Sequence, residues 1–212
     1  MALNRFPDSQ TVTIPEIPTQ ATVSLPADKS AVIVVDMQND FVRPDGALYV
    51  EAAAGTVDVI ADVVERARIK NVPVVYTRDT HGEEDREFEI WPRHCVRGTR
   101  GWQIVEELSP QEGDLIVDKN RYDGFYSTPM EHYLSRVWDV EHVVIMGTVA
   151  NICVGQTAAS AGLRWFHVVT PADGISAMND FDQASALRQI SFLYNGTIAV
   201  NGADIEFTPG RD

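Results

Sequence analysis

The sequence predicts an α/β fold in which a parallel sheet carries helices on both of its faces. Two short runs, AVIVV at 31–35 and HVVIMG at 142–147, are apolar almost throughout, as in strands that are covered on both sides. Segments with apolar residues at helical spacing alternate with such runs, and this alternation is typical of successive βαβ units. The length of 212 residues, with 44% of them hydrophobic, suits one domain that buries a full core.

The expected elements alternate regularly from residue 30 onward. Runs rich in β-branched residues predict six strands, at 31–35, 72–77, 114–118, 142–147, 166–170 and 197–200. Val57, Ile60 and Val64 recur at helical spacing and predict an amphipathic helix over 53–70. Shorter apolar patterns predict further helices at 104–108, 130–137, 151–163 and 182–194.

The first 29 residues differ from the rest of the chain. They lack helical periodicity and contain Pro7, Pro15, Pro18 and Pro26. This composition predicts an extended N-terminal arm (1–29) that lies over the surface or on a neighbouring subunit. Residues 30–212 are expected to form the domain itself.

Charge and composition exclude several classes of partner. The 17 basic and 31 acidic residues give a net charge of −14, which would repel nucleic acids and anionic membranes. No apolar run approaches the roughly 20 residues that span a bilayer, and the N-terminus lacks the pattern of a secretory signal. Two cysteines are too few for a disulfide framework. We therefore expect a cytoplasmic protein that binds neither nucleic acid nor membrane.

Polar residues follow the first four predicted strands directly. In open parallel sheets, sites form beyond the carboxyl ends of the strands. In chain order, the residues that this rule brings to one edge are Asp36, Asp79, His81, Lys119 and Cys153. An acid, a cation and a thiol are thus expected to meet there.

These three residue types suit nucleophilic catalysis. Cys153 follows a glycine-containing turn at the start of a predicted helix, where the helix dipole and a nearby lysine would lower the thiol pKa. Asp36 would take the thiol proton, and Lys119 would hold the anions. Taken singly, each residue also has a structural interpretation: Cys153 as a buried core thiol, Asp36 as a turn carboxylate and Lys119 as a solvated cation.

The segment from 78 to 99 offers candidate metal ligands. Asp79, His81 and His94 have the oxygen and imidazole donors that suit Zn²⁺, with Fe²⁺ or Mn²⁺ as alternatives. A D-x-H pair alone also occurs in structural settings. The acidic run at 83–89 is expected to be a solvated loop from which Glu87 or Glu89 could reach a metal. The other histidines, and Cys95, are expected to be structural.

Three segments, VVDMQNDF, VDKNRYDGFY and GTVANICV, together resemble the isochorismatase-like cysteine hydrolases over about residues 30–200. The resemblance implies a three-layer α/β/α sandwich with a six-stranded, mostly parallel sheet, and a homo-oligomer (dimer or tetramer). It implies that Asp36, Lys119 and Cys153 are catalytic and that a thioester intermediate forms. It also implies a cis peptide at Thr148–Val149 and an oxyanion hole made by the N–H groups of Val149 and Cys153.

Within that family, the segment WPRHCVRGT is most similar to nicotinamidases. This similarity implies a metal at Asp79, His81 and His94, no organic cofactor, and nicotinamide as the small amide substrate. The implied substrate-binding residues are Phe41, Trp91, Phe125, Tyr126 and Ile152. Two alternatives stay open: hydrolysis of an N-carbamoyl or ureido compound, and a non-catalytic relative that binds a small metabolite.

Overall fold

Seven parallel strands form the central sheet of the computed structural model, which describes residues 13–210. The strands are β2 (Ser30–Val35), β3 (Val74–Asp79), β4 (Leu115–Lys119), β5 (His142–Thr148), β6 (His167–Pro171), β7 (Ile175–Ser176) and β8 (Thr197–Ala199). Their order is β4-β3-β2-β5-β6-β8, and β7 pairs with β5. The predicted parallel sheet is therefore confirmed. The added strand, β7, has only two residues, which is too short to give a sequence pattern.

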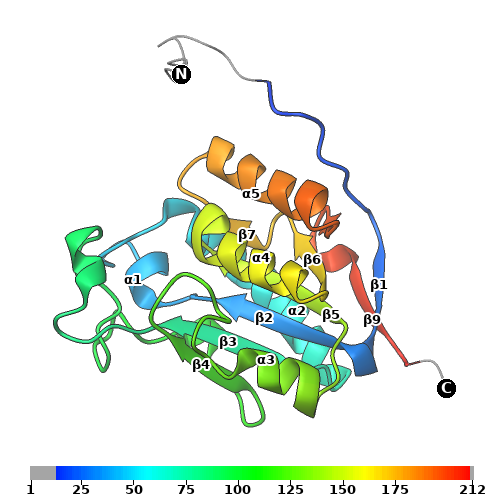
Figure 1. The fold of residues 1–212 in the computed structure, drawn as a ribbon, viewed down its shortest axis with the longest axis horizontal. Helices are drawn as coiled ribbons and strands as arrows, with labels where there is room; N and C mark the ends of the chain where they lie inside the picture. Colours follow the sequence, from blue (N-terminus) through cyan, green and yellow to red (C-terminus); the bar gives the residue numbers. More distant parts are fainter. Residues whose placement is uncertain (1–12, 211–212) are drawn as a thin grey trace.

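Helices cover both faces of this sheet (Figure 1). The α-helices of the described residues are α1 (Asn39–Val42), α2 (Val57–Ile69), α3 (Met130–His132), α4 (Gly155–Leu163) and α5 (Asp180–Leu193), of which α2, α4 and α5 contact the sheet strands. The connection through α2 leads from β2 outward to β3, whereas the one through α4 leads from β5 outward to β6 on the other side. Because both crossovers are right-handed, the two helices lie on opposite faces. The three-layer architecture is confirmed.

Several predicted helices begin or end in tighter or wider turns. The helix expected over 53–70 starts with a 3₁₀ turn at Glu51–Thr56, and the one expected at 104–108 is only a 3₁₀ turn at Glu106–Leu108. Wider π turns, at Tyr133–Val137 and Ala150–Val154, follow α3 and precede α4. Three further 3₁₀ turns lie at Ala27–Lys29, Arg86–Glu89 and Gly202–Asp204.

A second, two-stranded sheet joins the predicted arm to the end of the described chain. In it β1 (Val23–Pro26) pairs in parallel with β9 (Ile205–Thr208). Val23 and Leu25 are buried against the domain, so this part of the arm is held by its own chain. Residues 1–12 of the arm lie outside the described residues. The sequence pattern does not predict this strand pair.

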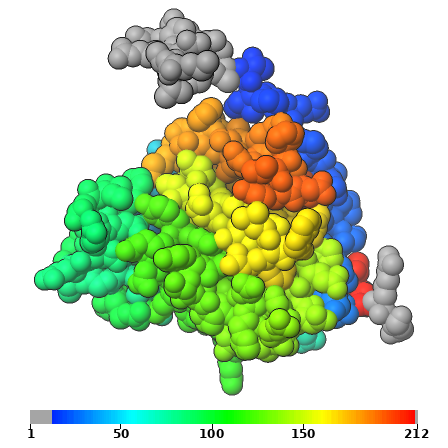
Figure 2. Space-filling model, viewed as in Figure 1, coloured from blue at the N-terminus to red at the C-terminus, as the bar shows by residue number. Residues whose placement is uncertain are grey.

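The strand order reverses between β2 and β5 at the centre of the sheet. All six residues of β2 are buried. Chain connections leave β2 and β5 in opposite directions, which opens a crevice beyond their carboxyl ends. Figure 2 shows α4 and α5 (yellow and orange) beside the green segments that follow β3 and β4.

No helix among residues 13–210 is long and apolar enough to cross a membrane.

Candidate active site

Three neighbouring strand ends deliver the polar residues expected at this edge. Asp36 directly follows β2, Asp79 ends β3, and Lys119 ends β4 as the register partner of Asp79. All three side chains are buried. Asp36 has a φ of 52°, which turns the chain sharply away from the strand. The structure therefore brings these three residues together, as the strand positions predicted.

The fourth residue, Cys153, reaches the site through a tight turn after β5. Gly147 has a φ of 125°, and a Cβ there would lie 2.1 Å from the Val35 carbonyl oxygen, so only glycine fits. The Thr148–Val149 peptide bond that follows is cis, as the resemblance implied. Cys153 lies in the π turn that leads into α4, and it is only 7% exposed.

Lys119 lies at the centre of the resulting cluster. Its Nζ is 2.7 Å from Asp36 Oδ2 and 3.7 Å from Cys153 Sγ. It is also 3.2 Å from Asp79 Oδ1. The Thr77 hydroxyl donates to Asp36 Oδ1 over 2.6 Å and fixes that carboxylate from the other side. One buried cation thus contacts two carboxylates and a thiol.

Burial dominates the protonation of Cys153 and Asp36. It raises the pKa of Cys153 well above the usual thiol value, against the opposing charge of Lys119. Burial also raises the pKa of Asp36. Burial would raise the pKa of Asp79 too, but the charge of Lys119 and the hydrogen bonds from His81 and His94 together outweigh it and hold that pKa far below its usual range. The expectation of a lowered thiol pKa is therefore wrong for the resting site, where Cys153 keeps its proton beside Asp36.

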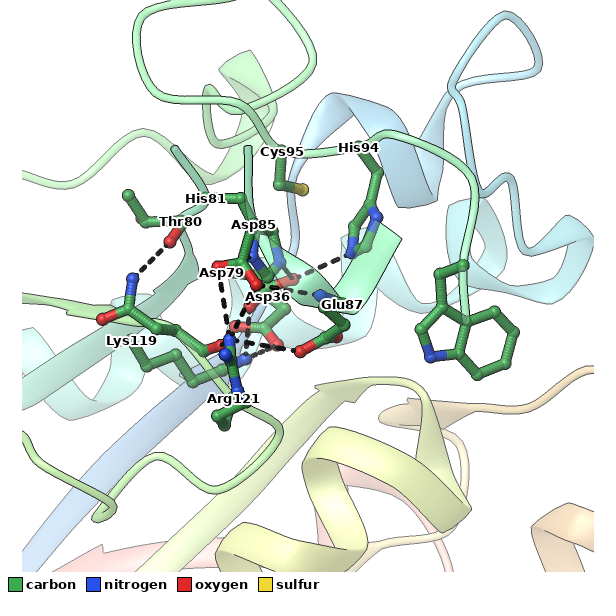
Figure 3. A network of polar contacts seen from close by, with 12 residues as sticks. Asp36, Asp79, Thr80, His81, Asp85, Glu87, His94, Cys95, Lys119 and Arg121 are labelled. Carbon is green, nitrogen blue, oxygen red and sulfur yellow. Dashed lines mark hydrogen bonds and ion pairs between the residues drawn. The ribbon is translucent and has the colours of Figure 1, made fainter. Parts of the chain in front are cut away.

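A second cluster adjoins the first through Asp79 (Figure 3). Asp79 Oδ2 lies 3.0 Å from His81 Nε2 and 3.2 Å from His94 Nε2. Buried Glu87 completes a group whose four potential ligand atoms lie within 4.8 Å of one another. Sequence reasoning named Glu87 as within reach of a metal but expected the run around it to be solvated. The 3₁₀ turn at Arg86–Glu89 buries it instead.

The donor atoms of this second cluster fit a divalent cation. His94 Nδ1 donates to the Pro92 carbonyl over 2.7 Å, so Nε2 is the ring nitrogen that faces the centre of the cluster and could bind a metal. Burial lowers the pKa of His81, but the carboxylates of Asp79, Asp85 and Glu87 together raise it to about 9, so the cluster attracts positive charge. Two imidazoles and two carboxylates are a donor set that Zn²⁺ accepts.

A pocket of about 370 Å³, counting its open mouth, lies over both clusters. It is lined by Phe41, Leu48, Asp79, Glu87, Trp91, His94, Tyr122, Val149, Ile152, Cys153 and Met178. The expected pocket residues Phe41, Trp91 and Ile152 are among them. Trp91 Nε1 donates to the Tyr122 hydroxyl over 2.9 Å and joins two walls of the pocket. Within residues 13–210, no lysine or arginine lines this pocket.

Phe125 and Tyr126 lie away from the pocket, in contrast to the expectation. Phe125 stacks on Phe166 with ring centroids 6.1 Å apart, and Tyr126 is 61% exposed. The Gly124 N–H donates to the Thr157 hydroxyl of α4 and ties the loop down, which turns Phe125 toward the core. Tyr122 takes the place at the pocket wall instead. The sequence held no signal for this exchange, because all three aromatic residues lie in one irregular loop.

The residues expected to be structural lie outside both clusters. His142 and His167 are register partners at the starts of β5 and β6, the opposite end of the sheet from the site. His132 packs edge-on against Tyr133. Cys95 is fully buried, and its backbone N–H donates to Asp40.

Comparison with known proteins gives concordant matches. A family model described as the isochorismatase domain matches residues 30–201. The ureidoacrylate amidohydrolase RutB from Rhizobium rhizogenes is 29% identical, over 91% of this chain and 88% of the relative.

Two solved structures share the fold and part of the sequence. N-carbamoylsarcosine amidase from Thermoplasma acidophilum has a TM-score of 0.74 and 34% identity, over 81% of this chain and 95% of the other. The pyrazinamidase of Pyrococcus horikoshii, in complex with zinc, has a TM-score of 0.75 and 30% identity, over 80% of this chain and 98% of the other.

Proposed function

Because the chain belongs to the isochorismatase domain family, we propose that it is a cysteine amidohydrolase that releases ammonia from a small amide. One observation carries this proposal: Cys153 lines the pocket with its thiol 3.7 Å from Lys119 Nζ, and the same Nζ lies 2.7 Å from Asp36 Oδ2. A nucleophile, a proton acceptor and a fixed cation are the components that amide hydrolysis through a covalent intermediate requires.

The proposed reaction uses Asp36 as the proton carrier twice: it carries the Cys153 proton to the leaving nitrogen, and then a proton of the attacking water back to the sulfur. Asp36 takes this proton as Sγ attacks the amide carbonyl carbon, and it passes the proton to the nitrogen as the C–N bond breaks and ammonia leaves. Water then attacks the thioester, with Asp36 as the base, and the thiol is restored as the acid departs. Lys119 holds the transient thiolate. The N–H groups of Val149 and Cys153 are the proposed donors to the carbonyl oxygen.

We propose that Asp79, His81, Glu87 and His94 hold a divalent ion, with Zn²⁺ favoured over Fe²⁺ or Mn²⁺. When bound, such an ion supplies a Lewis acid that orients a heteroatom of the substrate or a water molecule. Asp79 would then connect this ion to Lys119, since its two oxygens face different clusters.

Nicotinamide is the substrate we favour. Phe41, Trp91 and Tyr122 give the pocket aromatic walls that suit a flat, uncharged ring. N-carbamoylsarcosine and ureidoacrylate each carry a carboxylate, and the pocket wall offers no lysine or arginine within the described residues to bind one. Similarity to enzymes named for those two compounds nevertheless makes an N-carbamoyl or ureido amide the second candidate.

Ammonia release over a small panel of amides tests both candidates. The panel contains nicotinamide, pyrazinamide, N-carbamoylsarcosine, ureidoacrylate and biuret, each assayed with and without prior chelation. Chelator-sensitive turnover of nicotinamide is the expected result. Turnover of a carbamoyl compound that chelation leaves unchanged would favour the second candidate.

The matched control for this assay is Cys153→Ala. Loss of a covalent nucleophile costs about 10⁴-fold or more in turnover, while a truncation next to the pocket should leave the fold intact. If no amide is turned over by the parent, or if Cys153→Ala retains more than about one per cent of the activity, the cysteine mechanism is refuted. We also propose that the protein is cytoplasmic and that it forms a dimer or tetramer. Light scattering on the purified protein tests the oligomeric state.

A further inference from the structure

Asp85 contacts two members of the second cluster without belonging to it. One of its oxygens, Oδ2, lies 3.0 Å from His81 Nδ1. The other, Oδ1, accepts the backbone N–H of Glu87 over 2.9 Å and caps the turn at Arg86–Glu89. A single carboxylate therefore contacts the ring of one potential ligand and the backbone of another (Figure 3).

The contact with His81 fixes which nitrogen of the ring faces the cluster. An ionised carboxylate only accepts hydrogen bonds, so Nδ1 must carry the hydrogen. Nε2 lies 3.0 Å from Asp79 Oδ2 and shares its hydrogen with that oxygen in the metal-free site. When a cation binds, Nε2 is the nitrogen that gives up its hydrogen and offers a lone pair, because Nδ1 keeps its hydrogen for Asp85. In His94 the Pro92 carbonyl accepts the hydrogen of Nδ1 in the same way, which leaves Nε2 facing the cluster. The two imidazoles thus present their Nε2 atoms toward one point.

Arg121 keeps Asp85 itself out of the cluster. Its Nη1 is 3.2 Å from Asp85 Oδ1 and 3.5 Å from Glu87 Oε2. With the guanidinium, the imidazole and the backbone N–H around it, the Asp85 carboxylate has no oxygen turned toward the centre. It acts on its neighbours and not as a further ligand.

We propose that Asp85 is a positioning residue for metal binding: it orients His81 and fixes the turn that carries Glu87. The inference rests on the proposed divalent site, and it makes no assumption about the substrate. Carboxylates that orient ligating histidines in this way typically contribute 10–100-fold to metal affinity, and here the same carboxylate also places a second ligand.

The substitution Asp85→Asn separates the two contacts. The asparagine oxygen can still cap the turn at the Glu87 N–H, because Asn and Asp are comparable N-caps. The side chain then offers His81 only an amide N–H, which favours the tautomer with hydrogen on Nε2 and removes the lone pair from the cluster. We expect about 10–100-fold weaker binding of Zn²⁺ and an unchanged midpoint of unfolding for the metal-free protein.

The measurement is the dissociation constant of Zn²⁺ for the full chain, obtained by competition with a chromogenic chelator. The control Glu84→Gln removes the same charge from the neighbouring, exposed position and should leave this constant within about twofold of the parent. Asp85→Ser is a second variant, since serine keeps a cap but cannot reach His81, and it should weaken binding to a similar extent.

Two results would overturn the inference in distinguishable ways. A parent that binds Zn²⁺ while Asp85→Asn and Asp85→Ser bind it equally well would refute the role of Asp85 alone. A parent that binds no Zn²⁺ would refute the metal site together with this inference. In that case the ammonia assay would still report on the cysteine mechanism separately.

Discussion

Replacing Lys119 with methionine removes the one cation that the two clusters share. The side chain is 0% exposed and faces Asp36 at 2.7 Å, Asp79 at 3.2 Å and the Cys153 thiol. Truncating one partner of a buried ion pair typically costs about 3–5 kcal/mol, because the other charge is left in an apolar site. Asp79 keeps its contacts with two histidines, so Asp36 is the group left without a cation. We therefore expect Lys119→Met to lower the free energy of unfolding by about 3 kcal/mol, the lower end of this range.

The loss should depend on pH with a definite sign. Without Lys119, the pKa of Asp36, which burial already raises, rises further in the folded state. A carboxyl whose folded pKa is raised contributes stability below its unfolded pKa and loses it as pH increases. The deficit of Lys119→Met should thus be larger at pH 8 than at pH 5. Adding Asp36→Asn, which removes the stranded charge, should restore much of the stability at pH 8.

Urea unfolding of the parent, both variants and a control at the two pH values measures these effects. The control, Lys70→Met, removes an exposed lysine at the end of α2 and should change stability by less than about 0.5 kcal/mol. If Lys119→Met unfolds within about 1 kcal/mol of the parent at pH 8, or if its deficit grows on acidification, the assigned role of Lys119 as a buried counter-charge is wrong.

Three further variants test other parts of the structure. Gly147→Ala should lower the free energy of unfolding in urea by about 1–3 kcal/mol, because the new Cβ would meet the Val35 carbonyl oxygen. The control Gly55→Ala, which has open space around it, should be nearly neutral. Equal effects of the two substitutions would contradict the assigned turn. Tyr122→Phe removes the acceptor of the Trp91 indole and should raise KM up to about 10-fold with a smaller change in kcat, and an unchanged KM would argue against its role at the pocket wall. His167 has a lowered pKa because of burial and the charge of His142, so its stabilising effect is present at pH 7 and lost as pH falls through the folded pKa. His167→Gln should consequently lose less stability than the parent between pH 7 and pH 5, and parallel pH profiles would refute this account.

The strands that carry the site could be predicted because their signal is local. The apolar run of β2 is buried at every position, and the residue after it, Asp36, could be placed at the sheet edge by counting alone. Lys119 and Cys153 were placed by the same rule. The candidate metal ligands Asp79, His81 and His94 were predicted from their chemistry, and the structure brings them together. Their catalytic and ligating roles stay predictions.

Other features depended on contacts between distant segments. The pairing of β1 with β9 joins residues that lie at opposite ends of the described chain, and four residues of alternating burial give too weak a pattern to predict. Glu87 looks like part of a solvated acidic run until the turn capped by Asp85 buries it. Tyr122 lines the pocket in place of the expected Phe125, in a loop that is tied to α4 through Thr157.

The sequence by itself determined the parallel α/β sheet, the family resemblance and the strand ends at which polar residues gather. Periodicity and strand-end position are properties of short segments, so they can be read without the rest of the chain. Only the tertiary structure decided which of these groups contact the Lys119 ammonium and which aromatic side chains face the pocket. It also decided that the Cys153 thiol keeps its proton. Each of those outcomes depends on burial and on distances of a few ångströms between segments far apart in sequence, where desolvation and charge act at close range.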